Sequence, residues 1–214
     1  MEELFESRGA AGVTLAQLLK QYRNHAVAMA VGANGVSVAA EVARLLYLPL
    51  GIVPVVKLRG PTGVIFGALA PGGAAVVDWR SVTVVGENTA RVIAVREQAE
   101  LARLEKIYRE LAALPVARRT VILIADAMDT GMSVRAALRA LRLGHPARVI
   151  AAAPVVTARA CGDVRADGCE CVCLVSVASN HPVGAWYREV HEPHDCEALG
   201  QLQRLARHAR FTVA

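Results

Sequence analysis

The sequence has few aromatic residues for a chain of its hydrophobicity. Its 214 residues include two Trp, four Tyr and three Phe, although 54% of them are hydrophobic. Most of the apolar surface therefore comes from small and medium aliphatic side chains, a composition typical of buried parallel strands covered by helices. We expect an α/β protein with a sizeable core.

Long apolar runs, export signals and paired cysteines are missing as well. The most apolar stretch, residues 26–43, is broken by Asn34, Ser37 and Glu41, so we expect no membrane span. The N-terminus, MEELFESRGAAG, is acidic and lacks the basic and apolar order of a signal peptide. Five cysteines form no paired framework, so we expect reduced thiols and a cytoplasmic protein.

Lysine is scarce, because Lys20, Lys57 and Lys106 are the only ones in the chain. The net charge of +5 is therefore carried almost entirely by arginine, whose planar guanidinium group suits small molecules that bear phosphate. The excess charge is too small and too scattered to indicate a nucleic-acid partner.

The hydrophobic pattern predicts a single domain over residues 1–214, in which helices and parallel strands alternate with right-handed crossovers. The expected strands are AVAMAV (26–31), GIVPVVK (51–57), VILIAD (121–126), ARVIAAAPVV (147–156) and CECVCLVSV (169–177). The expected helices are LAQLLKQYRN with Thr14 as its cap, VSVAAEVARLLYL from Val36, residues 88–114, SVRAALRALRL from Ser133, residues 158–166, and a last helix capped by Asp195. An arm or hood is expected from residues 60–115, where VIFGALA and AAVVDW suggest a hairpin, and from residues 176–195.

The most informative segment is VILIADAMDTGMSVRAALRAL, in which a buried strand ends at Asp126 and a helix begins a few residues later. The unpaired N–H groups of a first helical turn, together with nearby hydroxyls, make a site for an anion such as a phosphate monoester. Asp126 and Asp129 would repel that phosphate, so we expect them to face sugar hydroxyls, hydrated magnesium or a proton to be removed. The alternative is purely local, with a strand end, a turn and a cap at Ser133.

The same segment resembles the phosphoribosyl-pyrophosphate motif of type I phosphoribosyltransferases, in which an apolar strand, two acids and Thr-Gly-x-Ser precede a helix. The resemblance to stand-alone bacterial predicted phosphoribosyltransferases is nearly end to end. It includes FESRGAAGVTLAQLL, VGANGVSVAAEVARLLYLPLGIVPVVKL, REQAELARLEKIYREL and VGAWYREVHEPHDCEAL. It implies a parallel sheet flanked by helices, a small hood or arm, and a homodimer.

The resemblance also implies roles for the residues of this loop. Thr130, Gly131, Met132 and Ser133 match the residues that bind the 5-phosphate through backbone N–H groups and hydroxyls. Asp126 matches the second acid of the motif, which holds a ribose hydroxyl directly or through hydrated Mg²⁺.

Two further segments match ligand-binding parts of the family. Residues 32–35, with Ala33, Asn34 and Gly35, match the pyrophosphate loop, and Lys57 matches a basic residue that would neutralise the diphosphate. The pair Trp186 and Tyr187 resembles the hood that covers the base in some relatives, and the alternative is a packing anchor.

Three positions depart from the family pattern. Ala125 stands where the family has its first acid, and Ala33 stands where these relatives usually have arginine. Each lost charged hydrogen bond costs on the order of 1.5–3 kcal/mol of ligand affinity. Asp129 stands where these relatives have a small residue and resembles the general base of 6-oxopurine phosphoribosyltransferases, so we hypothesise that it takes a proton or orients the acceptor.

Two clusters of potential metal ligands have simpler interpretations. Cys169, Cys171 and Cys173 alternate along a strand, so we expect them to pack on one sheet face. His191, His194 and Cys196 lie around Pro193, so we expect an exposed loop rather than a metal site. In the long helix we expect an apolar stripe that includes Val92 and Val95 and a solvated charged face. The face comprises Glu97, Glu100, Arg103, Glu105 and Arg109.

The leading interpretation is a Mg²⁺-dependent transferase that moves ribose 5-phosphate from phosphoribosyl pyrophosphate to a nitrogen acceptor such as a nucleobase. One alternative is a catalytically degenerate nucleotide-binding or regulatory protein, which Ala125 and Ala33 favour. Another keeps the site and changes the acceptor, for example to water or a phosphorylated metabolite.

Overall fold

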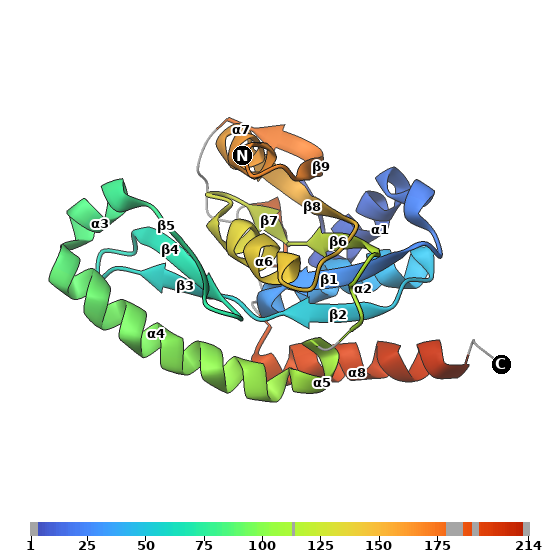
Figure 1. The fold of residues 1–214 in the computed structure, drawn as a ribbon. Helices are drawn as coiled ribbons and strands as arrows, with labels where there is room; N and C mark the ends of the chain where they lie inside the picture. The colour runs from blue at the N-terminus through green and yellow to red at the C-terminus, as the bar shows by residue number, and fades with distance from the viewer. Residues whose placement is uncertain (1–3, 113, 179–185, 190–192, 212–214) are drawn as a thin grey trace.

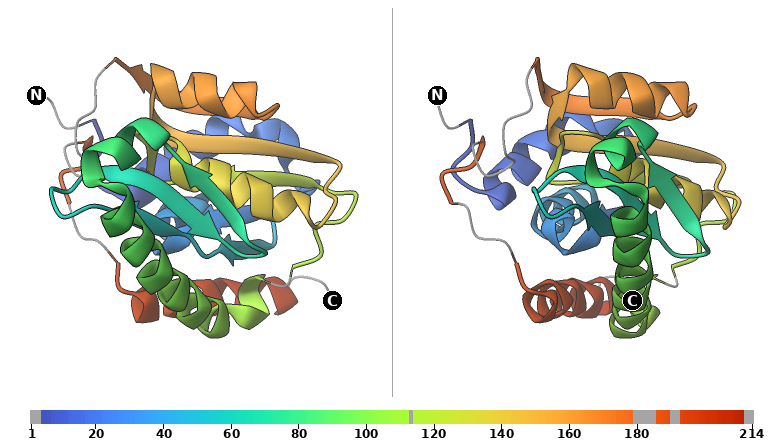
Figure 2. Two further views of the ribbon diagram at one scale, coloured as in Figure 1. Left: turned by 60° about the vertical axis from the view of Figure 1, so that its left-hand side comes forward. Right: turned by 90° about the vertical axis from the view of Figure 1, so that its left-hand side faces the viewer.

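The structure, a computed structural model, describes residues 4–112, 114–178, 186–189 and 193–211, with only the backbone described from 206 onward. A mostly parallel sheet with helices on both faces lies beside a smaller antiparallel sheet (Figures 1 and 2). The α/β prediction is therefore confirmed. No helix in the described part of the chain is long and apolar enough to cross a membrane.

The main sheet alternates with helices along the chain. Its strands are β1 (Ala26–Val31), β2 (Leu50–Val53), β6 (Thr120–Ile124), β7 (Ala127–Met128), β8 (Arg148–Thr157) and β9 (Glu170–Val177). The helices around it are α1 (Arg8–Leu18), a 3-10 turn (Lys20–Tyr22), α2 (Gly32–Leu46), α6 (Met132–Arg142), α7 (Ala158–Ala166) and α8 (Asp195–Phe211). The smaller sheet contains β3 (Val56–Arg59), β4 (Ile65–Ala70) and β5 (Ala74–Val77), followed by α3 (Trp79–Val85), α4 (Glu87–Ile107) and α5 (Arg109–Ala112).

The strand order is β2-β1-β6-β8, and every pair in this sheet is parallel. β9 pairs with the other edge of β8, and β7 continues beside the end of β8 on the β6 side. The register Ala30↔Ile124 aligns the ends of β1 and β6, and Ile124 pairs with Ala152 in β8, which continues in the same direction to Thr157. The loops that follow these strands therefore lie at one edge of the sheet.

Both faces of the sheet are buried, as the near-continuous apolar strands predict. Ala26, Ala28 and Ala30 of β1 face a core formed with α1 and α2. Val27 and Met29, which alternate with them, face a second core formed with α6 and α7. The sheet is consequently a rigid platform whose loops can hold a site.

The single strand expected at 51–57 is wrong, because the chain is divided at Pro54 into two strands of different sheets. β2 ends at Val53, and β3 begins at Val56 in the smaller sheet, where it pairs with β4. Proline supplies no N–H to a sheet ladder, so the chain leaves the main sheet at this point. Lys57 therefore lies on β3 of the smaller sheet. The other two strands of that sheet, β4 and β5, form the expected hairpin.

Two expected helix caps are wrong. Ser7, not Thr14, caps α1, because its Oγ accepts a hydrogen bond from Ala10 N. Asp195 is the first residue of α8, and its carboxylate binds the Tyr108 hydroxyl at 3.2 Å and the Arg103 guanidinium. These contacts connect α8 to the end of α4.

The expected helix at 88–114 is divided into α4 and α5, with α3 preceding α4. Val92 and Val95 are both 70% exposed, so the expected apolar stripe is wrong at these positions. The buried residues of α4 are Ala90, Ile93, Leu101 and Leu104. Of the expected charged face, Arg103 and Arg109 are exposed, and the three glutamates are partly buried.

The alternating cysteines pack as predicted. Cys169 and Cys171 are buried with α6 and α7, and Cys173 packs against the same core. Burial, together with the neighbouring Cys161 thiol, raises the pKa of Cys171 to about 12. These thiols therefore stay protonated at neutral pH.

We expect Gly35→Ala to lower the free energy of unfolding by about 1–3 kcal/mol, the usual cost of overpacking. A Cβ at Gly35 would lie 2.7 Å from the Ile124 carbonyl oxygen, where α2 meets β6. The matched control is Gly162→Ala in α7, where a Cβ meets nothing within 4 Å and should stabilise the helix by about 0.5–1 kcal/mol. The free energy of unfolding of both variants is measured by urea denaturation. Equal changes in the two variants would contradict the close contact between Gly35 and Ile124.

Candidate active site

The loop after β6 and the start of α6 form the centre of the candidate site. Gly131 precedes α6 in the left-handed conformation, with φ of 70°, and no side chain caps the helix. A Cβ at Gly131 would also lie 3.3 Å from the Ala160 side chain. Thr130 Oγ1 lies 3.5 Å from Met132 N, a weak contact, so the first-turn N–H groups are well placed for an anion.

Residues 32–35 lie next to this loop, but they do not form the free loop that we expected. They are the first turn of α2, and Gly32 has φ of 62° as the chain leaves β1. Ala33 and Asn34 are partly buried at this turn. The close approach of Gly35 to Ile124 brings this turn against the end of β6, where Ala125 follows.

Thr157 holds the loop in place from the end of β8. Its Oγ1 donates a hydrogen bond of 2.6 Å to the Asp129 carbonyl oxygen and accepts one of 3.0 Å from Ala160 N. It is buried and is also the N-cap of α7. The sequence analysis did not single out Thr157, although a threonine between a strand and a helix is a recognisable cap signal.

One oxygen of the Asp129 carboxylate is desolvated. Its Oδ1 is buried and has no hydrogen-bond partner among the described residues. Burial raises the pKa of Asp129, and the positive charges of Lys57 and Arg159 oppose that rise. A carboxylate in this state is suited to accept a proton from a bound molecule.

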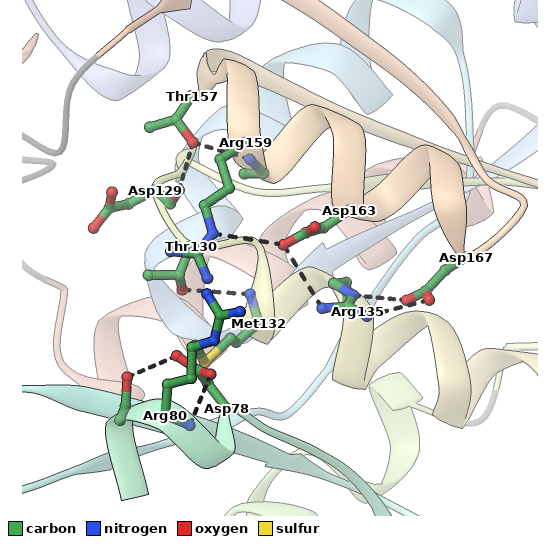
Figure 3. Close-up of polar contacts among 12 residues, drawn as sticks. Asp78, Arg80, Asp129, Thr130, Met132, Arg135, Thr157, Arg159, Asp163 and Asp167 are labelled. Atoms are coloured by element: carbon green, nitrogen blue, oxygen red, sulfur yellow. Dashed lines mark hydrogen bonds and ion pairs between the residues drawn. The ribbon is translucent and has the colours of Figure 1, made fainter. Parts of the chain in front are cut away.

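Cations from two parts of the chain surround the loop. In Figure 3 the side chains of Arg159, from α7, and Arg80, from α3, extend toward Thr130. A hydrogen bond from Ser81 and, more weakly, the charges of Arg159 and Arg80 lower the pKa of Asp78. The charge of Arg159 therefore acts both on Asp129, in the loop of the main sheet, and on Asp78, which follows the smaller sheet. The sequence pattern predicts neither arginine, because neither differs in sequence from an ordinary surface residue.

Asp126 lies at the same edge of the sheet, and its carboxylate is already engaged. Oδ2 accepts a hydrogen bond of 3.2 Å from Arg8 Nε, and Oδ1 accepts one of 3.0 Å from Ala127 N. The Tyr187 hydroxyl donates a 2.5 Å hydrogen bond to the Asp126 carbonyl oxygen. A carboxylate can accept about four hydrogen bonds, so the two from Arg8 and Ala127 do not fill its capacity.

Trp186 and Tyr187 pack in the interior. They are 8% and 1% exposed and form a small cluster with Ala11 and Val155. This arrangement corresponds to the packing anchor of the two interpretations. The rest of the expected hood, residues 179–185 and 190–192, lies outside the described residues.

Magnesium is usually bound by one or two carboxylates, waters and substrate phosphates, and this loop offers the carboxylates of Asp126 and Asp129. The unpartnered Asp129 Oδ1 fits contact with a hydrated ion. Asp126 would share its carboxylate between such a hydrate and Arg8. Among the described residues, no three His, Cys, Asp or Glu side chains are grouped to hold an ion by themselves. His194 and Cys196 are therefore in no such group, and His191 lies outside the described residues.

A surface hollow lies at the other edge of the sheet. It is lined by Arg142, His145, Arg148 and Glu170, near the amino ends of β8 and β9. Ligands of open parallel sheets bind at the carboxyl ends of the strands. The loop of Asp129 and Gly131 is therefore the stronger candidate for the active site.

We expect Asp129→Asn to raise the Tm at about pH 7 and to leave it unchanged at about pH 3. A folded-state pKa raised above 3.8 costs no stability below the unfolded value. The cost builds up as the pH rises from the unfolded to the folded value and is complete above the folded value. Glu41→Gln, in the exposed Glu41–Arg44 pair of α2, is the control and should change little. A lower Tm for Asp129→Asn at neutral pH would contradict the desolvation of Asp129.

Sequence comparison covers nearly the whole chain. A family profile described as the phosphoribosyl transferase domain matches residues 5–186. Two proteins of Mycobacterium tuberculosis, from strains CDC 1551 and H37Rv, carry provisional names as phosphoribosyl transferases. Each is 33% identical over 215 residues, which cover 96% of this chain. The chain spans 48% of the length of these relatives.

Solved structures share the fold. Protein TT1426 of Thermus thermophilus is 30% identical with a TM-score of 0.73, and the match covers 94% of this chain and 98% of that one. A hypothetical protein of Neisseria gonorrhoeae, solved with bound ppGpp, is 14% identical with a TM-score of 0.51, and the match covers 98% and 99%. The profile match and the curated relatives together show that this chain belongs to the phosphoribosyl transferase domain family.

Proposed function

We propose that this protein transfers ribose 5-phosphate from phosphoribosyl pyrophosphate to a nitrogen acceptor such as a nucleobase, with release of pyrophosphate. The observation that carries the proposal is the uncapped N-terminus of α6, preceded by the left-handed Gly131 and by the buried, unpartnered Asp129 oxygen. An anion site and a proton acceptor would therefore lie within one short loop at the carboxyl edge of the sheet.

The 5-phosphate of the donor would bind at the start of α6. The N–H groups of Gly131 and Met132 and the hydroxyls of Thr130 and Ser133 supply donors there, and the helix dipole favours the negative charge. Gly131 permits the left-handed turn that leads into this first helical turn, and its missing Cβ leaves room for Ala160 of α7. Asp126, at the adjacent strand end, would accept hydrogen bonds from the ribose hydroxyls.

Asp129 would act as the base. The bond from the acceptor nitrogen to the anomeric carbon forms as the bond from that carbon to the diphosphate oxygen breaks, and the nitrogen loses its proton. The desolvated Asp129 carboxylate would take this proton, since its raised pKa makes it a better base than an ordinary aspartate. Thr157 keeps the Asp129 backbone at the required place.

The diphosphate side of the site lacks the arginine that Ala33 replaces. Lys57 and Arg159 both act electrostatically on Asp129, so they would supply positive charge beside the departing group. Magnesium, when bound with the donor, would neutralise the diphosphate, with Asp126 and Asp129 in contact through its waters. A homodimer in which each chain carries its own site fits the proposal.

A second candidate is a protein that binds a nucleotide without catalysing transfer. Ala125 and Ala33 favour it, because each replaces a charged side chain of the family pattern. The pairing of Asp126 with Arg8 also favours it, since that pair partly neutralises the remaining acid. The ppGpp of the Neisseria structure is a suitable probe for this function.

We expect pyrophosphate release when the protein is incubated with phosphoribosyl pyrophosphate, Mg²⁺ and a panel of nitrogen heterocycles. Asp126→Asn should lower kcat/KM by about 10- to 100-fold, the effect of one charged hydrogen bond to the substrate. Asp129→Asn should lower kcat more than it changes KM for the donor, because the proton is transferred only in the chemical step. Glu41→Gln is the control and should behave as wild type.

Two outcomes would overturn the proposal. No release with any acceptor, together with measurable binding of ppGpp, would favour the nucleotide-binding function. Release that is unchanged in Asp126→Asn and Asp129→Asn would place the active site elsewhere.

A further inference from the structure

Arg8 is an arginine in the interior of the protein. It is the first residue of α1 and is 6% exposed, and its Nε donates a hydrogen bond to Asp126, 118 residues later in the chain. The two side chains form an ion pair with relative exposures of 6% and 12%. A buried charge is costly unless it is paired, so this contact constrains both partners.

Tyr187 contacts both members of this pair. Its ring lies against the Arg8 guanidinium, with 5.1 Å from Cζ to the ring centroid, and its hydroxyl donates to the Asp126 carbonyl oxygen. Burial, together with the negative charge of Asp126, raises the pKa of the Tyr187 phenol, so the hydroxyl keeps its proton at neutral pH. The backbone and the carboxylate of Asp126 are thus held by two different side chains.

Backbone pairing fixes the two segments that supply these side chains. Phe5 forms a parallel bridge with Tyr187, and the N–H groups of Leu4 and Phe5 donate to the Trp186 carbonyl oxygen. Arg188 N donates in turn to the Phe5 carbonyl oxygen. Segments from the two ends of the family match therefore meet at the strand end that carries Asp126.

We propose that Arg8 is a positioning residue that orients the Asp126 carboxylate toward the ribose of the donor. Each carboxylate oxygen accepts one protein hydrogen bond, from Arg8 Nε or from Ala127 N, so the group cannot rotate freely. The remaining lone pairs have fixed directions, and misplacement of a binding group by about 1 Å can cost on the order of 100-fold in rate. Because Ala125 supplies no carboxylate beside Asp126, the affinity for the donor depends more strongly on the orientation of Asp126. The inference rests on the proposed function.

The test is Arg8→Gln, measured for donor binding by calorimetry with Mg²⁺ and phosphoribosyl pyrophosphate and for kcat and KM. We expect KM and Kd for the donor to rise by about 10-fold or more at a temperature where the variant is folded. Arg103→Gln is the matched control, because it breaks another long-range pair with an aspartate, between α4 and α8. It should lower the Tm without changing the KM.

Further variants separate positioning from folding. Methylguanidine added to Arg8→Ala should restore part of the donor affinity, because the planar cation can refill the space between Asp126 and Tyr187. Arg8→Lys should restore less, since an ammonium group cannot lie flat on the ring. If Arg8→Gln does not fold, Tyr187→Phe keeps the ion pair and removes the hydrogen bond to the Asp126 backbone, and it should raise the donor Kd by a smaller factor.

Distinct results overturn the inference and the proposed function. A folded Arg8→Gln, or in its absence a folded Arg8→Ala without methylguanidine, that binds the donor as tightly as wild type would make this contact a structural anchor only. That result would leave the transferase proposal intact. A wild-type protein that binds no phosphoribosyl pyrophosphate would overturn the proposed function, and the inference with it.

Discussion

The parallel alignment of β1, β6 and β8 is the constraint on which the site depends. It brings the turn at residues 32–35, the loop at 126–133 and the start of α7 to one edge of the sheet. None of these segments could form a site alone. Because both faces of the sheet are buried under helices, the edge is rigid, and its loops gain fixed positions from the core.

Charge at this edge is divided between two differently placed aspartates. Asp126 is held by Arg8 and by backbone N–H, so its direction is set before any ligand arrives. Asp129 is desolvated. Within the described part of the chain its Oδ1 has no hydrogen-bond partner, and the charges of Lys57 and Arg159 act on the carboxylate from a distance. The first arrangement suits binding and the second suits proton transfer, which is how two identical side chains can take different roles.

Local patterns were sufficient to predict most elements of the main sheet. Residues 26–31 and 158–166 are a strand and a helix as expected, because each is a short, self-contained pattern with clear ends. The strand expected at 51–57 failed because its apolar run continues across Pro54 into another sheet. The predicted burial of Val92 and Val95 is wrong, because helical spacing shows that residues share a face but does not show which face is covered.

The loop of the candidate site could also be predicted, since its strand, acids, glycine and helix are contiguous. The partners of that loop could not. Arg8 and Asp126 are 118 residues apart, and the contact depends on how the N-terminal helix packs. Arg159 and Arg80 lie near the candidate site because of how α7 and α3 are placed in the fold, and their own sequence neighbourhoods are ordinary.

The central claim is that the start of α6 binds a sugar phosphate. Backbone amide NMR of the ¹⁵N-labelled protein, titrated with ribose 5-phosphate and separately with ribose, tests it most directly. The account predicts that ribose 5-phosphate shifts the amide signals of Gly131, Met132 and Ser133 and that ribose at the same concentrations does not. Shifts confined to the hollow around Arg142 and Arg148, or none at all, would contradict it.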